Sequence, residues 1–554
     1  MTAFAKAFQE VGLVDNVPVD PSESIDPQAI PMMYRAQIQH RCSLMFAGDN
    51  KDLETWTKEW LYPKIKNPKN SDLEKPPNYY HSAIAPLKTE TIYRIHINFP
   101  FRLYTDGGQD SIKRPVLGRN GIPFLPGSSV KGIFRRVCTP AQAQNYCGDK
   151  TSLEPGCLRF HGAFPVGNWG DRINDVVHPQ EEWQIGCNTS KGRSAYALIS
   201  LYKPQMVFEF STATPERVDW DEVEAILKEA LSLGVGGKTS TGYGRNGSFD
   251  GTKLVIPAAS LQYRLQGVGV SSTLRTNVPE FRPNVFKAVL RGHTRRLLAG
   301  VCDQSQTSKV DKAIAQLFGS IQNPGATSVL WFPDPDNESF NTQNKVQTYE
   351  SSGRLYIDAP EKDVQFMRKV VQFAYTMAGF GKTWRRIWHG IFMQDYKRLA
   401  IGCHWSSPDI ETVQTKEELT GFLDTLHQLC LGRMGGNVAK PISWRETWHP
   451  QRVVVYCRLG KTSKAVRLFH NETFKATPAI GGRNIGDNRP KAVSSVWHRM
   501  LPVQGEQYLE IVTVFHGDRD VWAHQTEGNQ LIHFVEQLQA QSLELAWGFP
   551  LPMT

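Results

Sequence analysis

The order of hydrophobic and polar positions along the chain predicts both strands and helices. In residues 154–166, EPGCLRFHGAFPV, apolar and polar residues alternate, which is typical of a half-buried strand. In residues 220–233, WDEVEAILKEALSL, the apolar residues recur at helical spacing, which predicts an amphipathic helix. Residues 529–545, NQLIHFVEQLQAQSLEL, predict a second amphipathic helix, which we expect to dock on a neighbouring subunit.

A first glycine-containing motif lies in residues 121–136, GIPFLPGSSVKGIFRR, where an apolar run leads into a basic helix. Ser128 or Ser129 is placed to cap this helix, and the free N–H groups of its first turn would then face outward. Such a helix end attracts anions, and Lys131 and Arg135 add positive charge beside it. An ordinary capped surface helix without a ligand is the alternative.

A second motif, LGVGGKTSTGYGRNGSF, occupies residues 233–249 between a predicted helix and a strand-like run. Glycines such as Gly236 and Gly237 allow backbone conformations closed to other residues and let a ligand approach the main chain. Lys238 supplies positive charge and Thr239 supplies a hydroxyl donor. We expect a loop that cradles phosphate groups.

Spacing excludes two nucleotide-binding motifs for this loop. A P-loop requires glycine at position 232, which is Ser232, and it follows a strand, whereas this loop follows a helix. The GxGxxG pattern of residues 242–247 precedes a strand instead of the helix that a dinucleotide-binding motif requires.

The same three elements recur in the same order further along the chain. Residues 281–300 again lead from a proline into a basic helix, and residues 351–360 parallel the strand of residues 154–166. Residues 377–390, MAGFGKTWRRIWHG, repeat the Gly-Lys-Thr sequence of the second motif. We interpret the chain as two versions of one module.

Composition narrows the class of protein. The chain has 554 residues, too many for one core, and 40% of them are hydrophobic. Its net charge is +9, from 63 Lys and Arg against 54 Asp and Glu, which permits a nucleic-acid partner without requiring one. Neither a membrane-spanning segment nor a signal peptide is evident, and the nine cysteines include no CxxC pair. We therefore expect a cytoplasmic protein with no membrane partner.

On these motifs the sequence resembles the RAMP superfamily, the backbone subunits of type III CRISPR effector complexes. PGSSVKG (residues 126–132) followed by GVGGKTSTGYGR (residues 234–245) looks like the signature pair of that family. The first half is most similar to the terminal small backbone subunit of Cmr-type complexes. In the second half, residues 489–503, RPKAVSSVWHRMLPV, resemble the larger Cmr subunit. Fused tandem subunits of this kind also resemble those of type III-D variant complexes.

The resemblance implies an α+β fold with two tandem ferredoxin-like modules, related to the RNA-recognition motif and carrying insertions. We place an N-terminal extension and linker at residues 1–87 and the first module at residues 88–258. The second module spans residues 262–554 and includes a long C-terminal insertion or extension.

The resemblance also implies a subunit that stacks along a guide (CRISPR) RNA. The expected partners are that RNA, a complementary target RNA, other type III backbone subunits and the large signalling subunit. Tyr243, Trp384 and Trp388 are candidate platforms for base stacking, although aromatic residues at such positions belong to the core more often. The residues expected to contact RNA are Ser128, Ser129, Lys131, Arg135, Gly236, Gly237, Lys238, Thr239, Tyr243 and Arg245 in the first module, and Lys287, Arg291, Lys382, Trp384 and Arg385 in the second.

Family members that cleave target RNA carry an aspartate in the loop before the PGSS-type helix. Asp110 lies sixteen residues before Pro126, close to the family's usual placement, and we favour it over Asp106. Such a carboxylate can hold Mg²⁺ or orient the ribose 2′-OH, which would make the chain a metal-dependent endoribonuclease acting within a complex. Both aspartates are also ordinary turn residues, so a non-cleaving structural subunit stays open. The matching loop of the second module contains no aspartate, and Glu280 is its only carboxylate, so we expect that module to bind RNA without cutting it.

Two further alternatives concern metal and function. Cys138, Cys147, Cys157 and His161 lie where some relatives carry zinc, but their wide, irregular spacing favours buried free cysteines and makes them weak zinc candidates. A stand-alone endoribonuclease that processes guide RNA shares the fold, although no well-placed His, Tyr and Lys set supports that function.

Overall fold

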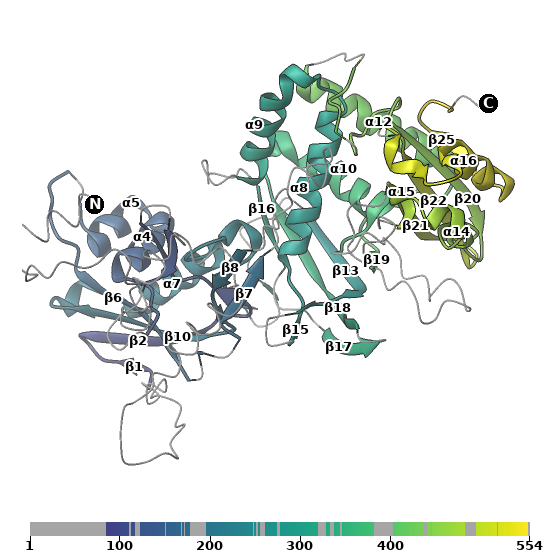
Figure 1. Cartoon of the computed structure of the whole chain (residues 1–554). Helices are drawn as coiled ribbons and strands as arrows, with labels where there is room; N and C mark the ends of the chain where they lie inside the picture. The colour runs from purple at the N-terminus through teal and green to yellow at the C-terminus, as the bar shows by residue number, and fades with distance from the viewer. Residues whose placement is uncertain are drawn as a thin grey trace, which may run out of the picture.

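The computed structural model contains three αβ units that follow one another along the chain, from the N-terminal unit through the teal central unit to the green and yellow C-terminal unit (Figure 1). The residues that the structure describes are 85–109, 112–116, 122–149, 151–167, 169–170, 172–177, 196–246, 249–250, 253–254, 261–273, 278–319, 328–332, 337–343, 346–381, 403–435, 440–444, 446–481, 495–517 and 519–551. Most of the predicted N-terminal extension, residues 1–84, lies outside this set.

The first module is built on a four-stranded antiparallel sheet with the order β1-β2-β10-β6. Strands β2, β6 and β10 take the places of the first, second and third strands of a ferredoxin-like βαββαβ unit, and β1 occupies the place beside β2 that the fourth strand would take. The main elements are β1 Leu87–Lys88, β2 Ile92–Asn98, α4 Gly127–Val137, β6 Leu158–Val166, β10 Gln205–Thr212 and α7 Trp220–Leu233. The smaller elements are β3 Arg102–Leu103, β4 Asp106–Gln109, β5 Ile112–Pro115, α5 Pro140–Gln142, η3 Ala143–Cys147, β7 Asn174–Val177, β8 Tyr196–Ile199, β9 Leu201–Tyr202, η4 Pro215–Arg217, η5 Thr239–Thr241, β11 Phe249–Asp250 and β12 Lys253–Leu254.

The second module has the complete ferredoxin-like order, because its sheet runs β16-β18-β13-β19 and β13, β16, β18 and β19 follow one another along the chain. Strand β17 adds to β18, and α9 and α12 extend the module. Its elements are β13 Leu261–Val270, β14 Ser272–Thr273, β15 Pro279–Glu280, α8 Asn284–Ala299, η6 Gln304–Gln306, α9 Thr307–Phe318, β16 Val329–Trp331, β17 Asn337–Gln343, β18 Val346–Asp358, α10 Glu361–Phe373, η7 Ala374–Ala378, β19 His404–Ser406 and α12 Lys416–Met434.

The C-terminal segment, which the sequence predicts to be an extension of the second module, contains its own sheet of order β21-β22-β20-β25. This is the same ferredoxin-like order, and we call residues 453–547 the third module. Its elements are β20 Val453–Gly460, α13 Ala465–Phe469, α14 Glu472–Lys475, α15 Pro478–Gly481, β21 Val496–Val503, β22 Gln507–Phe515, η9 Asp520–Trp522, β23 Ala523–His524, β24 Gly528–Asn529, α16 Leu531–Ala540 and β25 Glu544–Trp547.

Strand β20 explains how the third module attaches to the second. Val453, Val455 and Cys457 belong to the large core of the second module, whereas Val454 and Tyr456 belong to the core under the third module's own helices. Successive side chains of a strand point to opposite faces, so β20 is buried on both faces. Its uninterrupted apolar run, VVVYC, is the pattern of such a strand.

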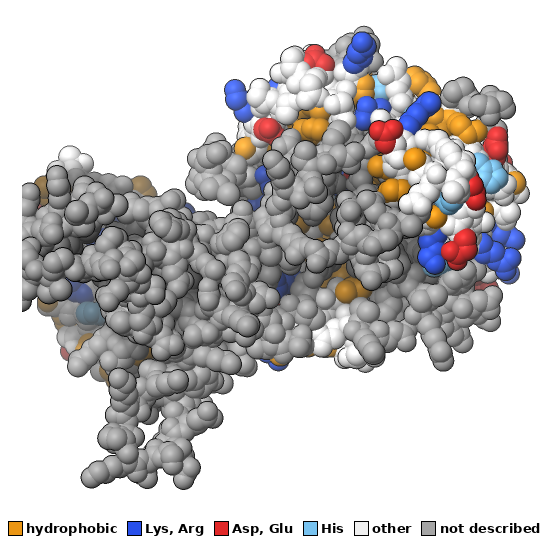
Figure 2. All heavy atoms as spheres, in the orientation of Figure 1, with side chains coloured by type: hydrophobic (Ala, Val, Ile, Leu, Met, Phe, Trp, Pro, Cys, Tyr) orange, Lys and Arg blue, Asp and Glu red, His pale blue; other side chains and the backbone are white. Residues whose placement is uncertain are grey.

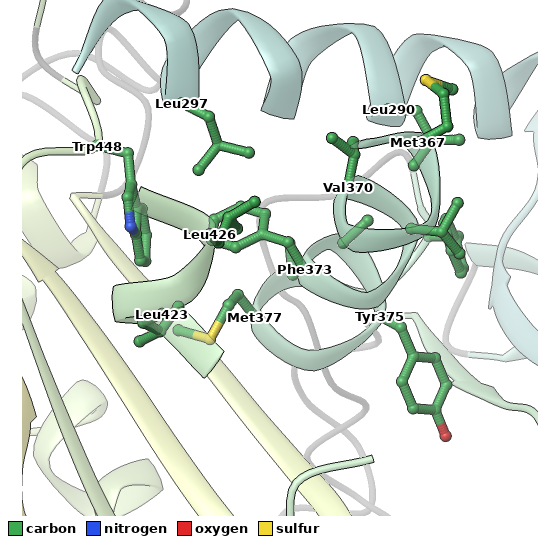
Figure 3. Close-up of a cluster of buried hydrophobic side chains, with 14 of the residues drawn as sticks. Leu290, Leu297, Met367, Val370, Phe373, Tyr375, Met377, Leu423, Leu426 and Trp448 are labelled. Atoms are coloured by element: carbon green, nitrogen blue, oxygen red, sulfur yellow. The ribbon is translucent and has the colours of Figure 1, made fainter. Parts of the chain in front are cut away.

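The shared core lies between helices of the second module and the sheet of the third. Figure 3 shows side chains of α8, α10 and α12 pointing toward one another beside Trp448. Phe373 and Trp448 meet edge to face with ring centroids 4.7 Å apart, and Trp448 stacks on Trp497 of β21 at 6.0 Å. The first module has a separate core, made largely by β2, β6, β10, α4 and α7. Modules two and three therefore pack as one unit.

These features confirm the predicted α+β class, and they confirm the helix at residues 220–233 and the half-buried strand that ends at Val166. The docking prediction for the C-terminal helix is wrong, because Leu531, Phe534 and Leu538 of α16 are buried in the third module's own core. None of the helices in the described residues is both long enough and apolar enough to cross a membrane. The predicted boundaries at 88–258 and 262–554 stay predictions.

Candidate nucleic-acid interface

The helix of the first motif, α4, begins against strand β6. A Cβ atom on Gly127 would lie 1.9 Å from the carbonyl oxygen of Phe160, so only glycine lets the helix start at this distance from the strand. Gly162, with φ of +97°, makes the second half of this contact, because its Cβ would lie 2.4 Å from the carbonyl oxygen of Leu125. The two glycines fix where the motif leaves the sheet.

The predicted serine cap of α4 is wrong. The N-cap residue is Pro126, and no side chain caps the helix. Ser128 and Ser129 lie inside the first turn, and both are exposed. The reason is that the close contact at Gly127 sets the helix start two residues earlier than a cap at Ser128 would. The two hydroxyl groups are consequently available at the surface.

The glycine-rich loop is folded against strand β3. The N–H group of Gly237 donates to the carbonyl oxygen of Tyr104 at 3.3 Å, and the N–H group of Gly244 donates to that of Arg102 at 2.8 Å. Gly236 has φ of +75°, and its Cβ would lie 1.9 Å from the Tyr104 oxygen. Lys238 adopts the left-handed conformation, with φ of +58°. Gly236 and Gly244 are thus required by close backbone approach within the protein.

Lys238 lies at the edge of this loop. Its ammonium nitrogen is 5.3 Å from the centre of the Tyr104 ring, a cation–π distance. Both Lys238 and Thr239 are half-buried, and the short helical turn η5 follows directly. A left-handed residue outside glycine is uncommon, and such strain concentrates at functional sites. Lys238 is the residue of the loop best placed to meet an anion.

The loop that is predicted to carry the cutting aspartate begins two residues after Tyr104. Strands β4 and β5 form an antiparallel hairpin in which Asp106 pairs with Pro115. At its base the N–H group of Val116 donates to the carbonyl oxygen of Thr105 at 3.0 Å. Asp106 therefore begins the hairpin two residues after Tyr104. Asp110 lies outside the described residues.

The basic side chains of α4 connect the first motif to the second. Arg136 donates from Nη2 to the carbonyl oxygen of Gly234 at 3.3 Å, and burial lowers the pKa of its guanidinium. Arg135 donates from Nη1 to the carbonyl oxygen of Gly148 at 2.8 Å. Lys131 lies half-buried on the same helix. The structure thus brings the helix, the glycine-rich loop and the hairpin base together.

Two predicted RNA contacts are instead part of the loop's support. Tyr243 is fully buried, and its ring lies 5.0 Å from that of Tyr104 and 5.3 Å from that of Phe101, so it offers no face to a base. Arg245 donates from Nη2 to the carbonyl oxygen of Leu233, and burial lowers its pKa to about 10. Both side chains turn inward because the loop folds back on strand β3.

The second module contributes Lys287 to this site in an unexpected way. Lys287 is 8% exposed, and its Nζ donates to the hydroxyl oxygen of Ser240 in the glycine-rich loop at 2.6 Å. Burial, together with the nearby charge of Arg291, lowers the pKa of Lys287 to about 8. Arg291 is half-buried, and burial also lowers the pKa of its guanidinium. The other predicted contacts of the second module, Lys382, Trp384 and Arg385, lie outside the described residues, as does Trp388.

Sequence reasoning missed Arg102. Its guanidinium is 0% exposed and donates from Nε and Nη2 to the two carboxylate oxygens of Glu280 at 2.7 and 2.6 Å. Glu280, the only carboxylate of the second module's loop, is therefore held in an ion pair between modules. Its partner is 178 residues away, so no local motif could have indicated the pair.

The three cysteines of the weak zinc candidates are free thiols, of which Cys147 and Cys157 are buried and Cys138 is half-buried. Cys138 donates to the carbonyl oxygen of Phe134 at 3.2 Å, and burial raises its pKa to about 12. Burial also raises the pKa of Cys147 and Cys157. His161 lies apart, with Nε2 2.7 Å from the hydroxyl of Ser211. Among the described residues, no group of three or more His, Cys, Asp or Glu side chains could hold a metal ion.

Surface charge alone does not mark a path for nucleic acid on the face shown in Figure 2. Blue and red side chains of the second and third modules are interspersed there. The candidate interface therefore depends on how the glycine-rich loop meets the hairpin base at Tyr104 and helix α4 at Gly234.

Comparison with known proteins finds one family. Residues 90–246 match the RAMP superfamily, and this range includes strands β2 to β10, helices α4 and α7, and the glycine-rich loop. The match confirms, for the first module, the relationship that the two motifs predict. No curated protein matches the sequence.

Two solved structures are similar to part of the chain. One is the cryo-EM structure of the type III-B Cmr-beta bound to cognate target RNA, with 18% identity, a TM-score of 0.22, and coverage of 28% of this chain and 57% of that chain. The other is the crystal structure of Cmr6 from Pyrococcus furiosus, with 16% identity, a TM-score of 0.18, and coverage of 29% of this chain and 98% of that chain. The similarity thus spans a little over half of the first structure's chain.

Proposed function

Because residues 90–246 carry a domain of the RAMP superfamily, we propose that the chain is a guide-RNA-binding backbone subunit of a type III CRISPR ribonucleoprotein. In this proposal the first module holds the guide through α4 and the glycine-rich loop. It also contributes Asp110, at the hairpin that follows Tyr104, to cleavage of a complementary target RNA. The further partners are the other type III backbone subunits and the large signalling subunit.

The observation that carries the proposal is that the glycine-rich loop and the β4–β5 hairpin meet at Tyr104, while Arg136 of α4 donates to the carbonyl oxygen of Gly234 in the same loop. The Gly237 N–H bonds the carbonyl oxygen of Tyr104, the Lys238 ammonium lies over the Tyr104 ring, and the β4–β5 hairpin starts two residues later. A single RNA strand is bound by positive charge that follows its phosphates. Lys238, Thr239 and the exposed hydroxyls of Ser128 and Ser129 supply charge and donors of this kind.

The chemistry of cleavage would come from the hairpin. Carboxylate oxygens are the ligands that Mg²⁺ prefers, so Asp106 and Asp110 fit that ion in kind. A bound Mg²⁺ would stabilise the charge that develops on the scissile phosphate. The carboxylate of Asp110 would orient the ribose 2′-OH, and Lys238, over the Tyr104 ring, would keep the phosphate beside it.

Binding is tested by reversing the charge of Lys238. We expect Lys238→Glu to abolish retention of RNA that co-purifies with the complex, because a phosphate contact becomes a repulsion. Lys228→Glu is the matched control, since Lys228 is a surface residue of the neighbouring helix α7 and pairs with Glu224 of the same helix. If both variants retained RNA equally across a salt titration, the loop would not be the guide-binding element.

Cleavage is tested by Asp110→Ala, with Asp106→Ala for comparison. We expect Asp110→Ala to leave assembly and guide binding unchanged and to remove one cut in a complementary target RNA, which chelation of Mg²⁺ also removes in the unaltered complex. A loss with Asp106→Ala alone would shift the role to Asp106. No loss with either variant would leave a non-cleaving structural subunit, and cutting of repeat RNA by the isolated chain would identify a processing enzyme.

A further inference from the structure

We propose that the second module holds the glycine-rich loop of the first module in its RNA-binding shape, with Glu280 and Lys287 as the positioning residues. This inference rests on the proposed RNA-binding function of the loop. It gives the second module a role in binding at the first module's site, in addition to any RNA contacts of its own.

The first contact that carries the inference is the ion pair of Arg102 and Glu280. Their side chains are 0% and 1% exposed, and two hydrogen bonds of 2.6 and 2.7 Å join them. Arg102 also donates from Nη1 to the hydroxyl of Ser200 and to the carbonyl oxygen of Arg172, both at 2.9 Å. These bonds leave the Arg102 guanidinium anchored on both modules.

The backbone of the same arginine also contacts the glycine-rich loop. Its carbonyl oxygen accepts the Gly244 N–H at 2.8 Å, and the carbonyl oxygen of Tyr104, two residues later, accepts the Gly237 N–H at 3.3 Å. The backbone of residues 102–104 therefore links Glu280 of the second module to two points of the loop, Gly237 and Gly244. A shift of Arg102 would move the surface on which the loop is folded.

The second contact reaches the loop directly. Nζ of Lys287, on helix α8, lies 2.6 Å from the hydroxyl oxygen of Ser240 and 3.4 Å from its carbonyl oxygen. Ser240 is in the turn η5 that follows Lys238. Lys287 is 8% exposed, so its charge is directed at the loop and not at the solvent. The sequence motif assigns this lysine to RNA, whereas the geometry assigns it to the loop.

A loop that is already ordered binds more tightly than one that must be ordered on binding, because the ordering entropy is then not lost at that step. The glycine-rich loop needs such support, since Lys238 is held in a left-handed conformation. Glu280 acts on the loop through Arg102, and Lys287 acts on it through Ser240 of η5.

The decisive variant is Glu280→Gln, measured in the full-length chain with a fluorescent single-stranded RNA. Removing a negative charge would raise RNA affinity if only long-range electrostatics mattered. The proposal requires the opposite, a roughly tenfold loss of affinity, because Arg102 loses its charged partner and the loop loses the support of a fixed Arg102. An unchanged or higher affinity in the folded variant would overturn the proposal.

Glu446→Gln is the matched control. Glu446 is 0% exposed and pairs with Arg296 at 2.5 Å, so the substitution removes the same charge from the same kind of buried pair, away from the loop. We expect its RNA affinity to equal that of the unaltered chain. An equal loss in both variants would mean that the effect of Glu280→Gln is general, and the proposal would fail.

A double-mutant cycle of Lys287→Met and Ser240→Ala decides the question if Glu280→Gln does not fold. Each substitution removes the same contact, the hydrogen bond between Lys287 and the Ser240 hydroxyl, so we expect their effects on RNA affinity to be strongly non-additive. Additive effects would mean that Lys287 contacts RNA itself, which overturns the positioning role. A loss of binding in Lys238→Glu with normal binding in these variants would refute this inference alone, whereas normal binding in Lys238→Glu would refute the proposed function.

Discussion

Gly236 offers a direct test of how the glycine-rich loop is shaped. Its φ is +75°, and a Cβ atom added to it would lie 1.9 Å from the Tyr104 carbonyl oxygen, so alanine is unfavourable on two grounds. The left-handed conformation costs a residue with a side chain about 1–2 kcal/mol, and forcing an atom into a filled space costs about 1–3 kcal/mol more. Gly236→Ala should therefore displace the loop at a cost of about 2–5 kcal/mol.

Only part of that cost has to appear in RNA binding for the effect to be measurable. If about 2 kcal/mol is needed to restore the loop on binding, affinity falls about 30-fold. We would measure affinity by fluorescence anisotropy with single-stranded RNA, and stability by thermal unfolding of the full-length chain. Because the contact is local to the first module, the unfolding of the second and third modules should be unchanged.

Gly421→Ala is the control for this substitution. Gly421 lies inside helix α12, and no heavy atom lies within 4 Å of the Cβ position. Alanine should stabilise that helix by about 0.5–1 kcal/mol and leave RNA binding unchanged. If Gly236→Ala bound RNA as tightly as the unaltered chain and unfolded at the same temperature, close packing on Tyr104 would not be what shapes the loop.

Three further predictions concern stability. Trp497 is 2% exposed in the shared core, so Trp497→Ala should destabilise the second and third modules together by about 3–5 kcal/mol. Separate unfolding transitions for the two modules in calorimetry would contradict the shared core. Burial raises the pKa of Glu510, but hydrogen bonds from His498, Ser463 and the Lys464 N–H outweigh burial and lower that pKa to about 2. The contribution of Glu510 to the free energy of unfolding is therefore complete above about pH 4.5 and is lost as the pH falls toward 2. Glu510→Gln should lack this acid-dependent part of the stability in denaturant titrations. Burial, with Arg519 and Arg452 nearby, lowers the pKa of His516 from 6.5 to about 4. The free energy of unfolding should therefore decrease as the pH is lowered from 6.5 to about 4, and His516→Asn should reduce this decrease. An unchanged pH profile in the variant would show that His516 does not titrate in this range.

Local motifs made part of the site predictable. Gly127 of PGSSVKG and Gly236 and Gly244 of the glycine-rich loop are required by close contacts with backbone carbonyl oxygens, and such contacts leave a visible sequence signal. What the motif does not contain is the direction of each side chain. Tyr243 stands between two glycines in the motif and is a candidate stacking platform on sequence alone, yet its ring turns onto Tyr104 in the core.

The third module shows a second limit of sequence reasoning. It has no glycine-rich loop after its second helix, since α16 ends at Ala540 and β25 begins at Glu544. Its fold depends on burial on both faces of β20, a pattern that is not specific to this family. The repeat was visible in the sequence of the first two modules because a glycine-rich stretch marks it, and the third module has no such mark.

The two junctions between modules differ in chemistry, and this difference bears on how the chain works. The second and third modules meet through an apolar core that includes Trp448, Trp497 and Phe515. Between the first and second modules, the described residues place the Arg102–Glu280 ion pair and the Lys287–Ser240 hydrogen bond, while the hydrophobic cores stay separate. Polar contacts of this kind depend on geometry far more than apolar ones do. In our proposal, the junction of the first and second modules therefore couples the position of the second module to the shape of the glycine-rich loop.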